Sequence, residues 1–293
     1  MKRKINWRKV VGRFFFILFS LSFILPLLSR IMPSGMNKAE TKLFFESKGL
    51  IFKDTFLQYG KQSLRFVCAG NDTLPMILFI HGSPGSWDAF KEYLSDTGLL
   101  ANHYLVAINR PGYGGTSMLG KATLQAQANA VAGVFHLKRN AKPMVIVSHS
   151  YGGPVAVKFT LQYPEAVSQL ILIAPTICPE IEEGIGFKRG LQKFSKLGLW
   201  RWTLAEDLKN STREMQPLPE ELRIMQPEFI KLKCPVTEIH GTDDALAPFG
   251  NQAYVKLQFV NAPVDTIVLR GEGHLIPFTM PAKIIEMIKA KVR

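Results

Sequence analysis

The chain has 293 residues, 47% of them hydrophobic, which is enough to bury the core of one large α/β domain or of two small ones. Its formal net charge of +13 is unevenly spread, since residues 1–30 carry seven Lys or Arg and no Asp or Glu, and the rest shows no basic stripe or nucleic-acid motif. Three widely spaced cysteines, Cys68, Cys178 and Cys234, exclude a disulfide framework and a cysteine-rich zinc site.

The N-terminal segment, 1–32, has the composition of a membrane anchor. Six basic side chains precede or border an uncharged apolar run at 14–28. This run is short for a spanning helix, which needs about 20 residues, but no small-x-small cleavage site follows it. We therefore expect an uncleaved, single-pass transmembrane helix with the body of the protein on the extracytoplasmic side. The alternatives are a cleaved signal peptide, giving a secreted or periplasmic protein, and a buried helix of the domain.

Strands and helices alternate after a polar linker expected at 33–48. The segments 50–60 and 62–68 predict an antiparallel hairpin at the edge of a sheet. Short apolar runs then predict buried strands at 76–80, 104–108, 143–147, 170–174, 235–239 and 265–269. Helices are expected at 86–94, 123–137, 152–163 and 281–292. This order indicates an α/β fold over 49–293, with a mostly parallel sheet and helices on both faces.

The alternation breaks at about 176–231, where the pattern is helical. Apolar and basic side chains mix there, with Phe187, Leu191, Phe194 and Leu197 at helical spacing and with Trp200 and Trp202 just beyond. We expect a helical lid insertion above the sheet that covers the substrate pocket. A sharper alternative adds contact between this basic, aromatic segment and an anionic membrane surface.

A polar insert, SHSYGG, follows the predicted strand at 143–147 and precedes a predicted helix. A nucleophile on such a tight turn needs small neighbours two positions before and after it, because the strand and helix backbones approach closely there. Ser150 has Ser148 and Gly152 at these positions. Around Ser148 they would be Ile146 and Ser150, and isoleucine is too bulky. Ser150 is therefore the candidate nucleophile, on a turn whose strain is usually kept for function.

From about residue 50 onward the chain resembles the α/β-hydrolase fold superfamily. Four motifs carry the resemblance, each after a predicted strand: HGSPGSWDAF from His81, NRPGYGGTS from Asn109, SHSYGG, and the late pair HGTDDALAP and GEGHLIPF. The resemblance implies an oxyanion hole formed by the backbone N–H groups of Ser83 and Tyr151. Asn109 stands where the family commonly has Asp, so only a structural role is carried over to that loop.

The family's chain order of serine, acid and histidine assigns the remaining two roles. The resemblance implies Asp244 as the acid, three residues after Gly241, with Asp243 as the alternative. His274 is implied as the base, since of the six histidines it alone fits this order and place. The other five are expected to shape loops (His81, His149) or to be structural or on the surface (His103, His136, His240).

These residues predict a serine hydrolase that cleaves a small-molecule carboxylic ester, lipid-like or with an apolar acyl chain, through an acyl-enzyme. No metal or organic cofactor is required, no nucleic-acid partner is expected, and no feature indicates an oligomeric state. The membrane is the expected partner of the N-terminal helix. Other serine chemistries of the fold stay open, namely thioesterase, amidase, peptidase and C–C hydrolase. A non-catalytic binding protein of the same fold is the alternative from a different class.

Overall fold

An eight-stranded sheet crosses the protein in the computed structural model, which describes residues 35–60, 62–116, 120, 122–184 and 205–292. Its strand order is β1-β2-β4-β3-β5-β6-β7-β8. The strands are β1 (Phe52–Tyr59), β2 (Gln62–Ala69), β3 (Met76–Ile80), β4 (Tyr104–Ile108), β5 (Met144–His149), β6 (Val167–Ile173), β7 (Val236–Gly241) and β8 (Val264–Leu269). The pairs β1–β2 and β2–β4 are antiparallel and all others are parallel, which confirms the predicted sheet.

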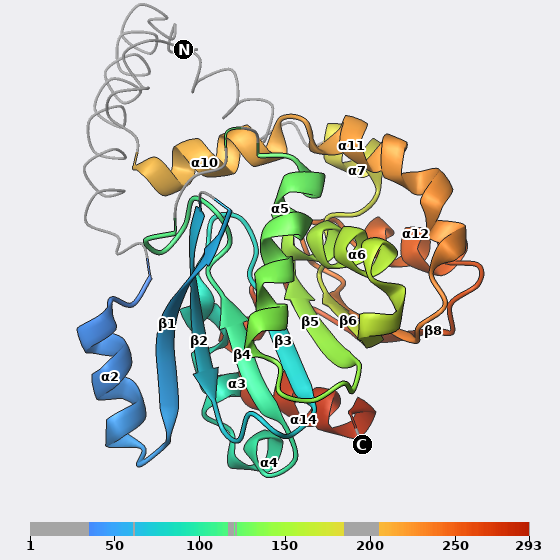
Figure 1. Ribbon diagram of the computed structural model, residues 1–293. Coiled ribbons are helices and arrows are strands. Elements are labelled where there is room, and N and C mark those ends of the chain that lie inside the picture. The colour runs from blue at the N-terminus through green and yellow to red at the C-terminus, as the bar shows by residue number, and fades with distance from the viewer. Residues whose placement is uncertain (1–34, 61, 117–119, 121, 185–204, 293) are drawn as a thin grey trace, which may run out of the picture.

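Helices cover both faces of the sheet (Figure 1). One face packs against α5 (Leu124–Val131), α6 (Gly152–Gln162), α11 (Leu218–Met225) and α12 (Gly250–Gln258). The other packs against α2 (Lys38–Ser47), α3 (Lys91–Leu94), α4 (Thr97–Leu100) and α14 (Pro281–Lys291). The sequence of strand β3 is apolar throughout because both faces of the strand are buried. Met76, Leu78 and Ile80 enter the first core, while Ile77 and Phe79 enter the second, because side chains alternate along a strand.

Two of the expected helices are partly 3₁₀. The segment expected at 86–94 is a 3₁₀ turn, Trp87–Phe90, followed by the short helix α3. The segment expected at 123–137 is α-helical as α5 and continues as a 3₁₀ stretch, Ala132–Leu137.

The second half of the expected linker is a helix, which corrects that expectation. Helix α2 begins with a capping box, in which the Asn37 side chain accepts from the Glu40 N–H and the Glu40 side chain accepts from the Asn37 N–H. Its Phe45 is fully buried and stacks against Phe52 and Trp87. This segment is therefore part of the packed domain.

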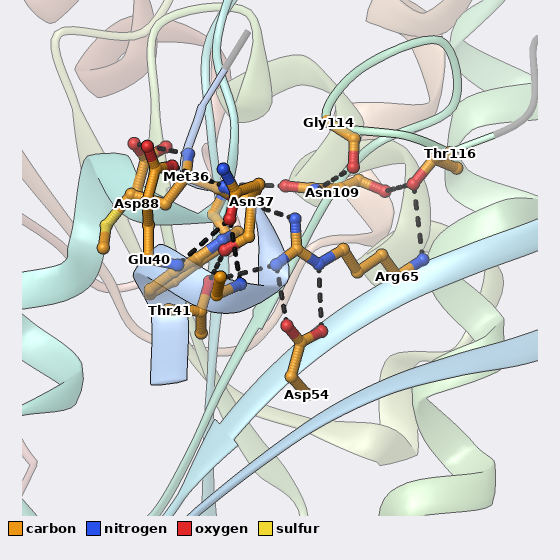
Figure 2. Close-up of polar contacts among 12 residues, drawn as sticks. Met36, Asn37, Glu40, Thr41, Asp54, Arg65, Asp88, Asn109, Gly114 and Thr116 are labelled. Carbon is orange, nitrogen blue, oxygen red and sulfur yellow. Dashed lines mark hydrogen bonds and ion pairs between the residues drawn. The ribbon is translucent and has the colours of Figure 1, made fainter. Parts of the chain in front are cut away.

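A buried arginine on β2 fastens the start of α2 to the sheet (Figure 2). Arg65 pairs with Asp54 through Nε (2.9 Å) and Nη2 (2.7 Å). It also donates to the Met36 carbonyl oxygen (2.8 Å) and to the Thr41 hydroxyl (3.0 Å). These bonds fix the position at which the segment before α2 joins the packed domain.

The insertion between β6 and β7 lies over the carboxyl ends of the parallel strands (Figure 1). Its described helices are α7 (Pro179–Gly184), α10 (Glu206–Met215) and α11, followed by the 3₁₀ stretch Gln226–Lys231. The amphipathic stretch around 187–202 lies outside the described residues, as does the apolar run at 14–28. None of the helices in the described ranges is long and apolar enough to cross a membrane.

Candidate active site

Ser150 lies on the turn between β5 and α6, at the carboxyl end of the sheet. Its φ is +54°, in the left-handed region that residues with a side chain rarely adopt. The turn also presses against the neighbouring strand, because a Cβ added to Gly152 would lie 2.4 Å from the Ile80 carbonyl oxygen. The chain thus has the strand, tight turn and helix that the sequence predicts, and glycine is required two residues after Ser150.

The two serines of this turn have different surroundings. Ser148 is fully buried within β5, and its hydroxyl has no hydrogen-bond partner among the described residues. Ser150 Oγ lies 3.0 Å from His274 Nε2. The histidine is therefore placed to receive a proton from Ser150 and not from Ser148.

His274 is held between Ser150 and a buried carboxylate. Its Nδ1 lies 2.8 Å from Asp244 Oδ2, in the loop after β7. The other carboxylate oxygen of Asp244 accepts the backbone N–H groups of Leu246 (2.9 Å) and Ala247 (2.7 Å). Since Asp244 accepts at Nδ1, this ring nitrogen carries the proton and Nε2 is free to accept one from Ser150. Asp243, the alternative acid, is exposed and accepts from the Thr242 hydroxyl (2.8 Å) instead.

A second histidine lies behind the carboxylate. His240 Nδ1 is 2.6 Å from Glu238 Oε1, and its Nε2 is 2.7 Å from the Ala247 carbonyl oxygen and 3.4 Å from Asp244 Oδ2. The Ala247 carbonyl oxygen can only accept, so Nε2 carries a proton. Burial alone would lower the pKa of His240, but the bonds to Asp244 and Glu238 raise it to about 9.

The same contacts keep Asp244 ionised. Burial alone would raise the pKa of this carboxyl, but hydrogen bonds from His240 and His274 outweigh burial and hold its pKa well below the ordinary value. A row of close polar contacts therefore runs from His274 through Asp244 and His240 to Glu238.

The loop that carries Ser83 lies directly against the nucleophile turn. A Cβ added to Gly82 would be 2.9 Å from Ser150 Cβ. The hydroxyl of Ser83 lies 3.0 Å from the hydroxyl of Tyr113. Tyr151, the residue after Ser150, is the N-cap residue of the eleven-residue helix α6. The positive end of that helix favours negative charge beside Ser150.

Two further histidines shape these loops. His81 Nε2 accepts the Arg110 N–H (3.0 Å), so Nδ1 carries the proton and donates to the Gly82 carbonyl oxygen (2.8 Å). His149 Nε2 lies 3.0 Å from the His274 carbonyl oxygen, and the two rings pack at 4.8 Å. Burial, with a smaller contribution from His274, lowers the pKa of His149 to about 3, so the ring is neutral.

Glu238 and His240 were not among the functional residues predicted from the sequence, where His240 was expected to be structural or on the surface. Two polar residues, two positions apart in a strand that is buried along its length, lie on one face and must find partners there. That pattern, in TEIHG, is the signal that could have found them. Among the described residues, no group of three or more His, Cys, Asp or Glu side chains is arranged to hold a metal ion.

Comparison with known proteins identifies the family of the chain. A family profile described as the alpha/beta hydrolase family matches residues 77–287. Epoxide hydrolase 1 of Caenorhabditis elegans is 31% identical over 40% of this chain and 29% of its own length. Human monoacylglycerol lipase ABHD6 is 28% identical over 60% of this chain and 50% of its own length. The chain thus spans half or less of these relatives. It covers 99% of the pimeloyl-[acyl-carrier protein] methyl ester esterase of Nitrosomonas europaea, at 26% identity over 78% of this chain.

Solved structures show the same fold. A bacterial membrane phospholipase A superposes with a TM-score of 0.65 at 18% identity, covering 97% of each chain. A thermophilic esterase from Thermogutta terrifontis gives 0.66 at 19% identity, covering 82% of this chain and 98% of that one. The family profile matches more than half of the chain, so the protein belongs to the alpha/beta hydrolase family.

Proposed function

We propose that the protein is a serine hydrolase that cleaves a carboxylic ester through Ser150, His274 and Asp244. The observation that carries this proposal is the continuous hydrogen-bonded row from Ser150 Oγ to His274 (3.0 Å) and from His274 to Asp244 (2.8 Å). It begins at a serine held at positive φ, with a helix N-terminus directly behind it. A plain structural role would require neither the strain nor the buried carboxylate.

The first half of the reaction forms an acyl-enzyme. Ser150 Oγ attacks the ester carbonyl carbon while His274 Nε2 takes the hydroxyl proton. Asp244 holds the Nδ1 proton in place and stabilises the imidazolium that results. The carbonyl electron pair moves onto oxygen, where the N–H groups of Ser83 and Tyr151 would donate to it. Each such donor is worth about 10²–10³ in rate at comparable sites.

The second half returns the enzyme to its starting state. His274 gives its proton to the leaving alkoxide, and the alcohol departs as the C–O bond breaks. Water then attacks the acyl-enzyme with His274 as base, and the carboxylic acid is released as Ser150 recovers its proton. All proton transfers pass through one histidine, so no metal or organic cofactor is required by this scheme.

The relatives support an ester as substrate. Proteins named as a monoacylglycerol lipase and a methyl ester esterase are similar to this chain, and both names describe ester cleavage. Epoxide hydrolases are also similar, but the nucleophile of that group is an aspartate, and the turn here carries Ser150. Thioesterase, amidase, peptidase and C–C hydrolase activity use the same three residues and remain the alternatives, as does a non-catalytic binding protein of the fold.

We also propose that residues 1–32 anchor the enzyme in a membrane with its hydrolase domain, 49–293, on the extracytoplasmic side. A secreted or periplasmic form after signal cleavage is the alternative. The basic N-terminal segment supports this arrangement, together with the insertion at about 176–231, whose sequence suits contact with an anionic surface.

A panel of chromogenic esters, thioesters and amides with short and long acyl chains tests the proposed activity. We expect ester hydrolysis to dominate, to increase with acyl length, and to be lost in Ser150→Ala. A wild-type protein that binds these compounds without turnover would favour the binding-protein alternative.

A further inference from the structure

A buried arginine from the loop after β4 holds the loop that carries Ser83. Arg110 is fully buried. Its Nε donates to the His81 carbonyl oxygen (2.9 Å), and its Nη2 donates to the Gly82 carbonyl oxygen (2.7 Å). These are the two peptide units just before Ser83, so the guanidinium fixes the direction in which the Ser83 N–H points.

The partner of this arginine comes from the insertion. Glu214 lies in the last turn of α10, is also buried, and accepts from Arg110 Nη1 (2.8 Å) and Nη2 (3.2 Å). Gln127 of α5 donates to the same carboxylate (2.8 Å). A buried charge without its partner is strongly unfavourable. If Glu214 moves, Arg110 must therefore move with it or lose its counter-charge.

A second route joins the same two elements. The Tyr113 hydroxyl donates to Glu214 Oε2 (3.1 Å), so the hydroxyl of Ser83 is the donor in its 3.0 Å contact with Tyr113. Asn210, one turn earlier on α10, donates to the Gly112 carbonyl oxygen (2.6 Å). Helix α10 therefore contacts the Ser83 loop through Arg110 and through Tyr113.

The guanidinium also lies over the ring of Tyr151, whose backbone N–H is the other candidate oxyanion donor. Its central carbon lies 4.9 Å from the ring centre of Tyr151 and 5.1 Å from that of Tyr113. One side chain thus contacts both the loop that carries Ser83 and the side chain of Tyr151.

We propose that Arg110 and Glu214 are positioning residues, which link the seating of α10 in the insertion to the geometry of the oxyanion hole. The proposal rests on the proposed hydrolase function. When α10 is seated, the Ser83 N–H is held in place for the reaction. When α10 shifts, Arg110 loses its counter-charge and the His81 and Gly82 carbonyls lose their donor, so acylation slows.

The chain offers a matched control for this link. Arg65 and Asp54 form another buried arginine–carboxylate pair, in which the arginine also donates to a backbone carbonyl and to a side-chain hydroxyl (Figure 2). Its side-chain contacts lie at β1, at α2 and at the Met36 carbonyl oxygen just before α2. Only the backbone of Arg65 meets the loop that carries Arg110, through Thr116 and Asn109, and neither side chain of the pair touches the Ser83 loop. Asp54→Asn therefore weakens folding in a comparable way without changing the oxyanion loop.

The experiment compares Glu214→Gln and Arg110→Lys with Asp54→Asn in the full chain. Turnover of a soluble ester is measured per active site, counted by exhaustive labelling with a fluorophosphonate, so that unfolded protein does not enter the rate. We expect Glu214→Gln and Arg110→Lys to lower kcat per site by about 10- to 100-fold with a smaller change in KM. Asp54→Asn should lower the melting temperature and leave kcat per site unchanged. Wild-type kcat per site in Glu214→Gln and Arg110→Lys would overturn the proposal.

Two further measurements keep the test decisive. Tyr113→Phe removes one hydroxyl and is expected to fold, so it provides the kinetic test if Glu214→Gln and Arg110→Lys do not fold. It should lower kcat per site. An unchanged kcat would overturn the link between α10 and the Ser83 loop through Tyr113. Amide hydrogen exchange of the segment 81–83 needs no activity. It should accelerate in Glu214→Gln and stay at the wild-type rate in Asp54→Asn. If the wild type hydrolyses no ester, the proposed function fails, while this exchange result still decides whether α10 and the loop are linked.

Discussion

Asp244 and Asp243 are neighbours in the chain with opposite surroundings. Asp244 is buried and accepts from His274 and from two backbone N–H groups, whereas Asp243 is exposed to solvent. We expect Asp244→Asn to lower kcat by about 10⁴, because an amide holds the imidazole in the wrong tautomer. Asp243→Asn should cost far less. Steady-state kinetics of the two variants on one ester measure this difference. A larger loss of kcat in Asp243→Asn than in Asp244→Asn would show that Asp243 is the acid of the triad.

His240 gives the protein a pH-dependent stability. Its ring faces Glu238, Asp244, the Ala247 carbonyl oxygen and the edge of Phe249. Its pKa of about 9 lies above that of an unfolded histidine, about 6.5. The folded protein therefore binds more protons than the unfolded chain between these two values, and stability falls as pH rises through that window.

Urea unfolding between pH 6.5 and 9 measures this effect. We expect the free energy of unfolding of the wild type to fall by roughly 1–3 kcal/mol across the window. His240→Gln keeps a donor near Glu238 but has no such titration, so its stability should be lower at pH 6.5 and should change less with pH. Parallel curves for the two proteins would show that His240 is not charged in the folded state.

The strand–turn–helix unit from β5 to α6 depends on the lack of a side chain at residue 152. A Cβ there would meet the backbone oxygen of Ile80 at 2.4 Å, and a backbone oxygen within a sheet has little room to shift. We expect Gly152→Ala to cost about 1–3 kcal/mol of stability and to displace Ser150 from His274, with slower acylation of the folded fraction. Gly184→Ala is the matched control, because a Cβ at the end of α7 meets no described atom within 4 Å. Equal stability and acylation rates in the two variants would contradict this account of the turn.

The buried strands were predictable because a strand covered on both faces is apolar at every position, and β3 and β4 are. The tight turn that carries Ser150 was predictable for a similar reason, since the close approach of strand and helix leaves a local pattern of small residues. Helix α2 was missed because its sequence, KAETKLFFES, is charged and short, and only contact with Phe52 and Trp87 buries Phe45. Arg110 pairs with Glu214, 104 residues away in the chain, and no local sequence pattern predicts such a contact.

The whole protein is expected to be held at a membrane by its N-terminal segment. The strict apolar run at 14–28 spans about 22 Å as a helix, against a hydrocarbon core of about 30 Å, so flanking residues such as Val10, Val11 and Ile31 must join it. We expect full-length protein to sediment with membranes, to keep Lys2, and to be digested by protease added from the extracytoplasmic side. A soluble product that begins near Ser34 would show signal cleavage, and a protected body would contradict the orientation.

We propose that Ser150 is the covalent nucleophile of a reactive triad. Intact-mass analysis after treatment with a fluorophosphonate probe tests it most directly, because the probe reacts only with an activated serine and adds a known mass. We expect one adduct per folded wild-type molecule, mapped by peptide sequencing to Ser150, and no adduct in Ser150→Ala. An adduct that persists in Ser150→Ala, one that maps to Ser148, or a folded wild-type protein that takes up no probe would contradict it.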